Sequence, residues 1–323
     1  MAVYTVITDA MIDRLLMQYD IGQRQSLTGI TQGVENTNYK LETDQGHYIL
    51  TIYEKRVDPA DLPFFISLKS HLASKGYPCP TPITANNGHV LQEFQGKSMA
   101  IVSFLNGNST AAPEWEHCQA AGTILAQMHL NGADFDMHRK NALGQKAWRP
   151  LMDLIKVDIR ETDHADQLPQ IENWLTSIEQ NWPNHLPQGI IHGDLFPDNV
   201  LFDNTIITGV IDFYFACQDM LAYDLAVMIN AWCFDKPHLF NLDKARALVA
   251  GYTECRPLQD NERQATLILA RGAAMRFYLT RLYDWIHTPK DAQVKPHNPD
   301  DYWQRLLFLH RIDTPSELGV SHG

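Results

Sequence analysis

Cysteine is scarce in this sequence, which contains five in 323 residues. The five are odd in number, scattered along the chain and never form a C-x-x-C pair. That pattern argues against a disulfide framework and against a zinc-finger type of site. We expect reduced thiols that are mostly buried. They lie at Cys79, Cys118, Cys217, Cys233 and Cys255.

Positive charge is also in short supply. The chain has 26 Lys and Arg residues against 38 Asp and Glu residues, which gives a net charge of −12. A protein that binds a nucleic acid polymer usually presents a basic face, so such a partner is not expected. An acidic chain can still bind a nucleotide when backbone amides and a metal ion neutralise the phosphates.

Long hydrophobic runs are missing as well. No stretch approaches the run of about 18 consecutive apolar residues that indicates a membrane span. The first residues, MAVYTVITDAMIDRLL, lack the basic segment and apolar core of a signal peptide. We therefore expect a cytoplasmic protein without a membrane partner, present as a monomer or a homodimer.

What is present indicates two lobes, because 323 residues exceed what most single cores hold. Residues 25–55 alternate between apolar and polar, with turn signals at residues 33–36. Helical spacing precedes them, in a helix that Thr8 and Asp9 can cap, and follows them in PADLPFFISLKSHLASKG. Later segments have helical spacing, as in PEWEHCQAAGTILAQMHL and IENWLTSIEQNW, whereas VKPHNPDDY is typical of a loop. The sequence predicts an α+β fold with a small antiparallel-sheet lobe, 1–103, and a larger, mainly helical lobe, 104–323.

Polar side chains concentrate in IIHGDLFPDNVLFDNTIITGVIDF, residues 190–213. Asp194 and Asn199 stand five residues apart, and Asp212 follows an apolar strand. This is the order and spacing of the protein-kinase catalytic loop and its metal-binding Asp. In such a site one Asp orients the acceptor hydroxyl and accepts its proton, while the Asn and the second Asp hold Mg²⁺ against the nucleotide phosphates.

The same stretch allows other interpretations. His192 is either a catalytic residue or a side chain that braces the loop. A metal-dependent hydrolase would use His192, Asp194 and Asp212 as ligands, and it would need further His or carboxylate ligands. Asp198 and Asp203 fit turn or cap positions.

The chain resembles the aminoglycoside-phosphotransferase and choline-kinase-like family of small-molecule kinases. HGDLFPDN with IDF carries the resemblance to the superfamily. Longer stretches are most similar to the homoserine kinases of that type; they include GVENTNY, YILTIYEKRVDPADLPFF, GYPCPTPI, YDLAVMINAWCF and RGAAMRFYLTRLYDW. The resemblance implies a two-lobed protein-kinase-like fold, ATP and Mg²⁺ as cofactors, and phosphorylation of the small molecule L-homoserine in threonine biosynthesis.

Residue by residue, the resemblance makes Asp194 the catalytic base, with His192 beside it, and makes Asn199 and Asp212 the Mg²⁺ ligands. It places nucleotide binding in QGVENTNY, on the third strand and in IVSFLNG, whose backbone would meet adenine. The residues that it implies there are Gly33, Glu35, Asn36, Asn38, Thr51, Ser103, Phe104 and Leu105.

One part of the pattern departs from a typical kinase. Thr51 stands where a kinase carries its strand Lys, and Phe64 or Phe65 stands near the expected helix Glu. Lys55 is a candidate to reach back toward the phosphates, or it is only the solvated end of a strand. The departure leaves a pseudokinase open, a module that holds nucleotide without turnover.

Homoserine also needs an acid for its ammonium group and an Arg or backbone amides for its carboxylate. We hypothesise that at least one of Arg271, Arg276 and Arg281 binds the carboxylate; a surface ion pair between Arg281 and Asp284 is the alternative. All candidate substrate residues lie in the larger lobe: Tyr214, Asp219, Tyr223, Arg271, Arg276, Arg281 and Asp284.

Other acceptors on the same scaffold are choline, an aminoglycoside or an amino sugar. Choline would call for an aromatic cage around its quaternary ammonium. Trp232, Phe234 and Trp285 are the candidates for such a cage.

Overall fold

The computed structural model describes residues 4–30, 36–54, 57–289 and 295–321. The chain divides into two compact units. The first contains residues 1–107 and 208–214, and the second contains residues 108–207 and 215–323. The sequence placed the boundary at residue 103 and kept the later segment in the larger lobe. Residues 208–214 belong to the first unit, where Val210 N–H donates to the carbonyl of Pro78 at 2.7 Å.

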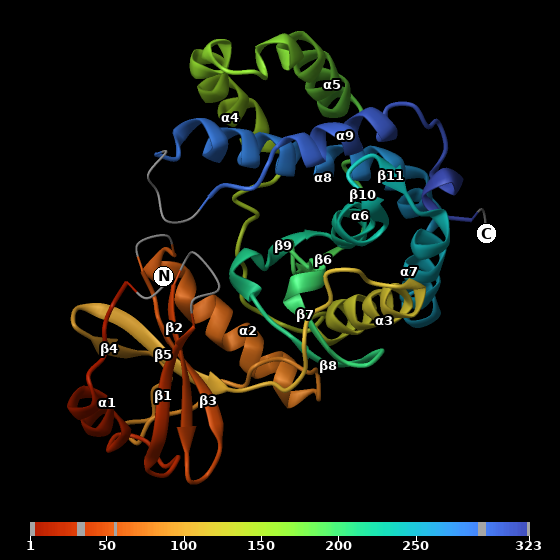
Figure 1. The fold of residues 1–323 in the computed structure, drawn as a ribbon. Helices are drawn as coiled ribbons and strands as arrows, with labels where there is room; N and C mark the ends of the chain where they lie inside the picture. Colours follow the sequence, from red (N-terminus) through yellow and green to blue (C-terminus); the bar gives the residue numbers. More distant parts are fainter. Residues whose placement is uncertain (1–3, 31–35, 55–56, 290–294, 322–323) are drawn as a thin grey trace. The chain divides into compact units, whose positions relative to one another are not determined.

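The first unit is built on a five-stranded antiparallel sheet in the order β1-β2-β3-β5-β4 (Figure 1). The burial of β2 alternates residue by residue, as expected for a strand with one face toward a core. The strands are β1, Arg24–Ile30; β2, Thr37–Thr43; β3, His47–Ile52; β4, Gln92–Phe94; and β5, Lys97–Ser103. This confirms the predicted antiparallel sheet.

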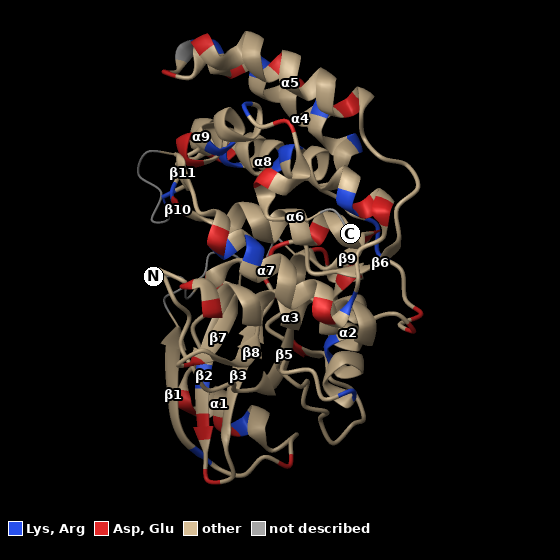
Figure 2. Ribbon diagram, turned by 90° about the vertical axis from the view of Figure 1, so that its right-hand side faces the viewer, with Lys and Arg blue, Asp and Glu red and all other residues tan. Residues whose placement is uncertain are grey.

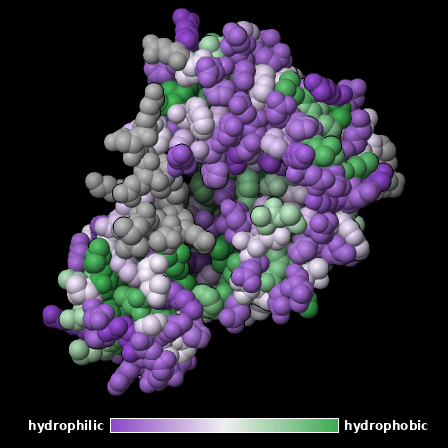
Figure 3. Space-filling model, viewed as in Figure 1, coloured by the Kyte–Doolittle hydropathy of each residue, from purple (hydrophilic) through white to green (hydrophobic). Residues whose placement is uncertain are grey.

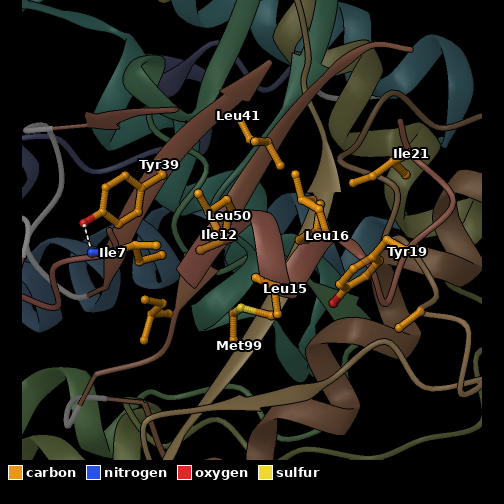
Figure 4. Close-up of a cluster of buried hydrophobic side chains, with 13 residues drawn as sticks. Ile7, Ile12, Leu15, Leu16, Tyr19, Ile21, Tyr39, Leu41, Leu50 and Met99 are labelled. Atoms are coloured by element: carbon orange, nitrogen blue, oxygen red, sulfur yellow. Dashed lines mark hydrogen bonds between the residues drawn. The ribbon is translucent and has the colours of Figure 1, made fainter. Parts of the chain in front are cut away.

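Helix α1, Asp9–Leu16, packs its apolar face on this sheet (Figure 4). Ile12, Leu15 and Leu16 join a buried cluster with Leu41 of β2 and Leu50 of β3. The spacing of three and four residues puts the three α1 side chains on one side of the helix. The unit also contains α2, Leu62–Ser74, which begins behind the short helix η1, Pro59–Asp61.

The second unit is mainly helical, as the sequence predicted (Figure 1). Its helices are α3, Trp115–Asn131; α4, Gln145–Asp158; α5, Leu168–Gln180; α6, Leu221–Trp232; α7, Leu242–Cys255; α8, Asp260–His287; and α9, Asp300–Leu309. The short strands beyond residue 108 are β6, Gln188–Ile191, paired with β9, Cys217–Met220; β7, Val200–Asp203, paired with β8, Ile206–Val210, whose residues 208–210 belong to the first unit; and β10, Phe234–Lys236, paired with β11, Leu239–Phe240. The remaining short helices are η2, Ile159–Glu161; η3, Ala165–Gln167; η4, Pro197–Asn199; η5, Phe213–Phe215; and η6, Pro315–Leu318.

Helices α3 and α7 pack so closely that their backbones are in contact, and two glycines make this possible. A Cβ on Gly122 of α3 would lie 2.0 Å from the carbonyl oxygen of Leu248, and one on Gly251 of α7 would lie 2.1 Å from that of Gln119. Any larger residue would force the helices apart. Both helices contact the buried helix α6.

Charged residues of both signs occur along α4 and α5, where Figure 2 colours the ribbon blue and red. Arg149 of α4 reaches Glu172 of α5 at 2.7 Å and also pairs with Glu179. Hydrophilic residues likewise cover most of the face seen in Figure 3. In the described part of the chain, no helix has the combination of length and apolar composition needed to cross a membrane.

Candidate functional site

Residues 192–199 of the polar stretch form a loop between β6 and β7 in the second unit. Gly193 has a φ of +74°, a conformation that favours glycine. A Cβ at that position would also lie 3.1 Å from the carbonyl oxygen of Phe215. The HGD sequence therefore needs its glycine, which turns the chain immediately before Asp194.

A buried carboxylate binds two backbone N–H groups of this turn. Asp224 of α6 is fully buried, and its two oxygens accept the backbone N–H groups of His192, at 2.7 Å, and Gly193, at 2.9 Å. His129 of α3 lies 3.2 Å from the same carboxylate. Burial raises the pKa of Asp224, but the hydrogen bond and charge of His129 and the charge of His192 outweigh it, so the pKa is lowered. An ionised carboxylate thus holds two consecutive amides in place.

Two further side chains donate hydrogen bonds to backbone carbonyls of the loop. Arg276 of α8 is 3% exposed and donates from Nη1 to the carbonyl of Gly193. Its guanidinium lies 4.3 Å from the ring centre of Phe277. Trp232 donates its indole N–H to the carbonyl of Leu195 at 2.8 Å. Asp194 therefore sits between residues that are held on both sides.

Asn199 closes the loop at the end of η4. Its side-chain nitrogen donates to the carbonyl of Asp194 at 2.8 Å, and its own N–H donates to the carbonyl of Phe196 at 3.0 Å. This arrangement leaves the amide oxygen of Asn199 as the atom suited to a hard cation such as Mg²⁺. The structure brings Asp194 and Asn199 together through this bond.

Asp212 belongs to the first unit and has a φ of +64°, which is rare for a residue other than glycine. Such strain is often found at functional sites. Its charge acts on Lys69 of α2, which is only 6% exposed. Burial lowers the pKa of Lys69 to about 8, although the charges of Cys79 and Asp212 oppose that change. Lys69 Nζ also lies 5.9 Å from the ring centre of Tyr214.

Sequence reasoning missed Lys69 and looked instead at Lys55, which lies outside the described residues. The sequence held a signal: Lys69 follows Phe65 by four residues and so shares the apolar face of α2. Phe65 and Tyr53 both pack edge-on against Tyr214, at 5.6 and 5.9 Å. A buried cation in this apolar setting, beside an acid, is a candidate functional residue.

Of the predicted nucleotide residues, Asn38 lies on β2 and Thr51 on β3, and Asn36 comes just before β2, whereas Gly33 and Glu35 lie outside the described part. Thr51 of β3 donates its hydroxyl to the side-chain oxygen of Asn38 on β2 at 2.8 Å. The side-chain oxygen of Asn36, a buried residue, accepts the N–H of Glu54 at 3.2 Å. Thr51 therefore links two strands at the position where kinases carry a lysine.

The predicted hinge follows β5 and is partly engaged in backbone bonds. Ser103 N–H donates to the carbonyl of Thr81 at 2.9 Å, and Phe104 N–H donates to the carbonyl of His47 at 3.1 Å. Neither of these two amides is available to adenine in this arrangement. The half-buried Leu105 follows them.

The predicted substrate arginines differ in environment. Arg271 donates to the carbonyls of Leu309, at 3.0 Å, and Ile312, at 2.9 Å, and so ties α8 to the chain after α9. Arg281 pairs with Asp301 at 3.3 Å. Burial lowers the pKa of Arg281, and the charge of Asp194 is among those that act on it.

The remaining candidates divide into buried and exposed side chains. Asp219 accepts from Asn141 at 2.7 Å and from the N–H of Met220 at 2.7 Å, so both of its oxygens are engaged. Tyr223 is 1% exposed and packs edge-on to Trp182 at 5.8 Å. Asp284 is exposed on α8.

The three rings suggested as a choline cage lie in separate environments. Trp232 is buried, and its N–H is engaged with the loop, whereas Trp285 is 44% exposed. Phe234 packs against Phe240 and Phe308 at 5.1 and 5.5 Å. Among the described residues, no group of three or more His, Cys, Asp and Glu side chains is placed to hold a metal ion.

The comparisons with known proteins agree with this geometry. Residues 26–258 match the phosphotransferase enzyme family. Solved structures with the same fold include a spectinomycin phosphotransferase, 14% identical with a TM-score of 0.69 over 98% of both chains. Another is a choline kinase from Cryptosporidium parvum, 15% identical with a TM-score of 0.64 over 88% of both chains. The fold is therefore the two-lobed, protein-kinase-like fold of small-molecule phosphotransferases.

Relatives with much higher sequence identity to this chain indicate a narrower group within the small-molecule phosphotransferases. The homoserine kinase of Paramagnetospirillum magneticum is 49% identical over 99% of this chain and 100% of its own length. That of Rhodospirillum rubrum is 47% identical over the same shares. The chain belongs to the phosphotransferase enzyme family and, within it, groups with these homoserine kinases.

Proposed function

We propose that this protein transfers the γ-phosphoryl group of ATP to the side-chain hydroxyl of L-homoserine, giving O-phospho-L-homoserine for threonine biosynthesis. The observation that carries the proposal is the match to homoserine kinases at 47–49% identity over 99% of the chain. The loop geometry adds to it, because the environment that holds Asp194 is built from buried residues of this chain.

In this proposal Asp194 orients the acceptor hydroxyl and accepts its proton as the hydroxyl attacks. The bonds from Asp224, Arg276 and Asn199 to the loop fix the backbone around it. A general base of this kind must be held within hydrogen-bond distance of its proton, and a pinned loop provides that precision.

Asn199 and Asp212 would be the ligands of Mg²⁺, whose charge offsets the charge of the phosphates. Both offer oxygen atoms, the donors that Mg²⁺ prefers. Lys69 would orient Asp212 from within the first unit and would supply positive charge in place of the lysine missing at Thr51. Because the reaction consumes ATP, we also propose that the protein acts in the cytoplasm.

The test is a panel of acceptors supplied with Mg-ATP, with ADP followed by a coupled assay. L-homoserine, L-serine, choline, 3-aminopropan-1-ol and an aminoglycoside would be compared at matched concentrations. We expect the highest kcat/KM with L-homoserine and loss of turnover in Asp194→Asn. Faster turnover of choline or an aminoglycoside would refute the proposed acceptor. ATP binding without ADP from any acceptor would favour a pseudokinase.

A further inference from the structure

Tyr302 of α9 is surrounded by cationic side chains of the second unit. The guanidinium carbons of Arg305 and Arg281 lie 4.4 and 4.7 Å from its ring centre. Arg305 also lies 5.2 Å from the ring centre of Phe234 on β10. Phe277 of α8 stacks on Tyr302 at 5.1 Å. A planar guanidinium that stacks on rings is held in place without using the N–H donors in its plane.

Several donors of this cluster have no partner in the described part of the chain. Nε and Nη1 of Arg305 are buried without a hydrogen-bond partner, and the same is true of Arg276 Nε and the hydroxyl of Tyr302. Tyr302 is itself 0% exposed. Most buried polar groups in proteins are paired, because an unpaired one costs about 1–3 kcal/mol. Four such atoms in one cluster indicate a ligand that supplies acceptors.

The arginines around Tyr302 also outnumber the carboxylates that form ion pairs with them. Arg281 pairs with Asp301, but neither Arg276 nor Arg305 forms an ion pair with a described carboxylate. A buried cation without a counter-ion is costly, so an anionic ligand would be favoured there. The ligand that fits is therefore an anion with at least two acceptor oxygens.

This cluster lies next to the loop that carries Asp194. Arg276 holds the carbonyl of Gly193, the residue before Asp194. Phe196, two residues after it, packs on Phe277 at 5.0 Å. The charge of Asp194 also acts on both Tyr302 and Arg281. An anion bound here would lie close to the hydroxyl that Asp194 is proposed to activate.

We propose that Arg305, stacked on Tyr302 and Phe234, is the residue that binds the carboxylate of the amino-acid acceptor. The inference rests on the proposed function, in which that acceptor is L-homoserine. Three carbon atoms separate its hydroxyl from its carboxylate, which suits an anion site beside the base. The fork of an arginine matches the two oxygens of a carboxylate. A phosphate oxygen of the nucleotide has similar chemistry, and the experiment separates the two sources.

The experiment compares two acceptors in the wild type and in Arg305→Met. L-homoserine carries the carboxylate, and 3-aminopropan-1-ol has the same hydroxyl and amine without it. We expect R305M to lower kcat/KM for L-homoserine by about 100-fold, the size of a lost charged hydrogen bond, and for 3-aminopropan-1-ol by less than about threefold. The KM for ATP should stay within about twofold.

Arg305→Lys keeps the charge and loses the fork, so it should restore part of the preference for L-homoserine. Arg311→Met is the matched control, because Arg311 is exposed just after α9; its kinetics should equal those of the wild type. If R305M does not fold, the ratio between the two acceptors in R305K decides the question in the same way.

Equal losses with both acceptors would overturn the inference, and a raised KM for ATP in that case would assign Arg305 to the phosphates. Unchanged kinetics with L-homoserine would also overturn it while leaving the proposed function intact. A wild type that phosphorylates no amino acid would refute both.

Discussion

The loop around Asp194 depends on a residue that contacts no substrate. Asp224→Asn keeps the size of that side chain, removes its charge and leaves it one acceptor oxygen in place of two. The N–H groups of His192 and Gly193 both donate to this carboxylate. In the variant, one of these two N–H groups must therefore lose its acceptor or point at the NH2 group of the new amide, which is itself a donor.

The expected cost follows from these contacts. A buried donor left without an acceptor costs about 1–3 kcal/mol, and a hydrogen bond to a charged group contributes about 1.5–3 kcal/mol. His129, 3.2 Å away, also loses its charged hydrogen-bond partner. We expect the free energy of unfolding to fall by about 3–5 kcal/mol, the usual range for breaking a buried pair. Displacement of Asp194 should lower kcat by about 10–100-fold.

Urea denaturation would measure the first effect and the coupled ADP assay the second. Asp203→Asn, at the exposed last residue of β7, is the control and should change stability by less than about 0.5 kcal/mol. A D224N protein with wild-type stability and turnover would refute the idea that this carboxylate fixes the loop. Wild-type turnover with reduced stability would limit Asp224 to a structural role.

The pH dependence of the same variant is a second measurement of this prediction. The pKa of Asp224 is lowered in the fold, below its ordinary value of 3.8. Its contribution to stability is therefore present above that value and is lost as the pH falls through the lower, folded pKa. The difference between wild type and D224N should be full at neutral pH and should shrink only below about pH 4.

Three further substitutions test other parts of the site. Asp194→Asn should lower kcat by about 100-fold or more with little change in the KM for ATP, and wild-type turnover in the folded variant would remove it as the base. Asp212→Ala should raise the Mg²⁺ concentration needed for half-maximal rate by at least about tenfold, whereas an unchanged Mg²⁺ titration would exclude it as a ligand. Lys69→Met should leave the melting temperature unchanged or higher, because a desolvated cation is removed, while kcat/KM for ATP falls by about 10–100-fold. A lower melting temperature with normal kinetics would make Lys69 structural.

Helices and strands with a regular hydrophobic pattern could be predicted from the sequence, because the pattern lies within a single element. In α3, Ala121, Leu125 and Met128 recur at helical spacing, and all three are fully buried. The loop residues Asp194 and Asn199 were found because the motif spacing is local. Both cases depend on neighbours a few positions apart in the chain.

The sequence was less informative where distant segments decide the structure. The stretch predicted as a loop becomes α9 from Asp300, and Arg305 enters the argument only because α9 places it on Tyr302. Helix α4 was not predicted, and Pro150 lies inside it. Lys69 and Asp224 are similar cases, since their partners lie far along the chain and the burial that makes them unusual is a tertiary property.

Buried charge is the feature that connects these residues. Lys69, Arg276 and Asp224 are each nearly or fully buried, and cores of similar size are often more stable with apolar residues in such places. Stability alone does not account for them. Each acts on a residue of the kinase motif or on its neighbour: Lys69 on Asp212, Arg276 and Asp224 on Gly193. Burying these charges costs desolvation free energy, but it holds the reacting groups in fixed positions and provides fixed charges for anionic ligands. Phosphoryl transfer requires both, because its catalysis is mostly positioning and charge stabilisation.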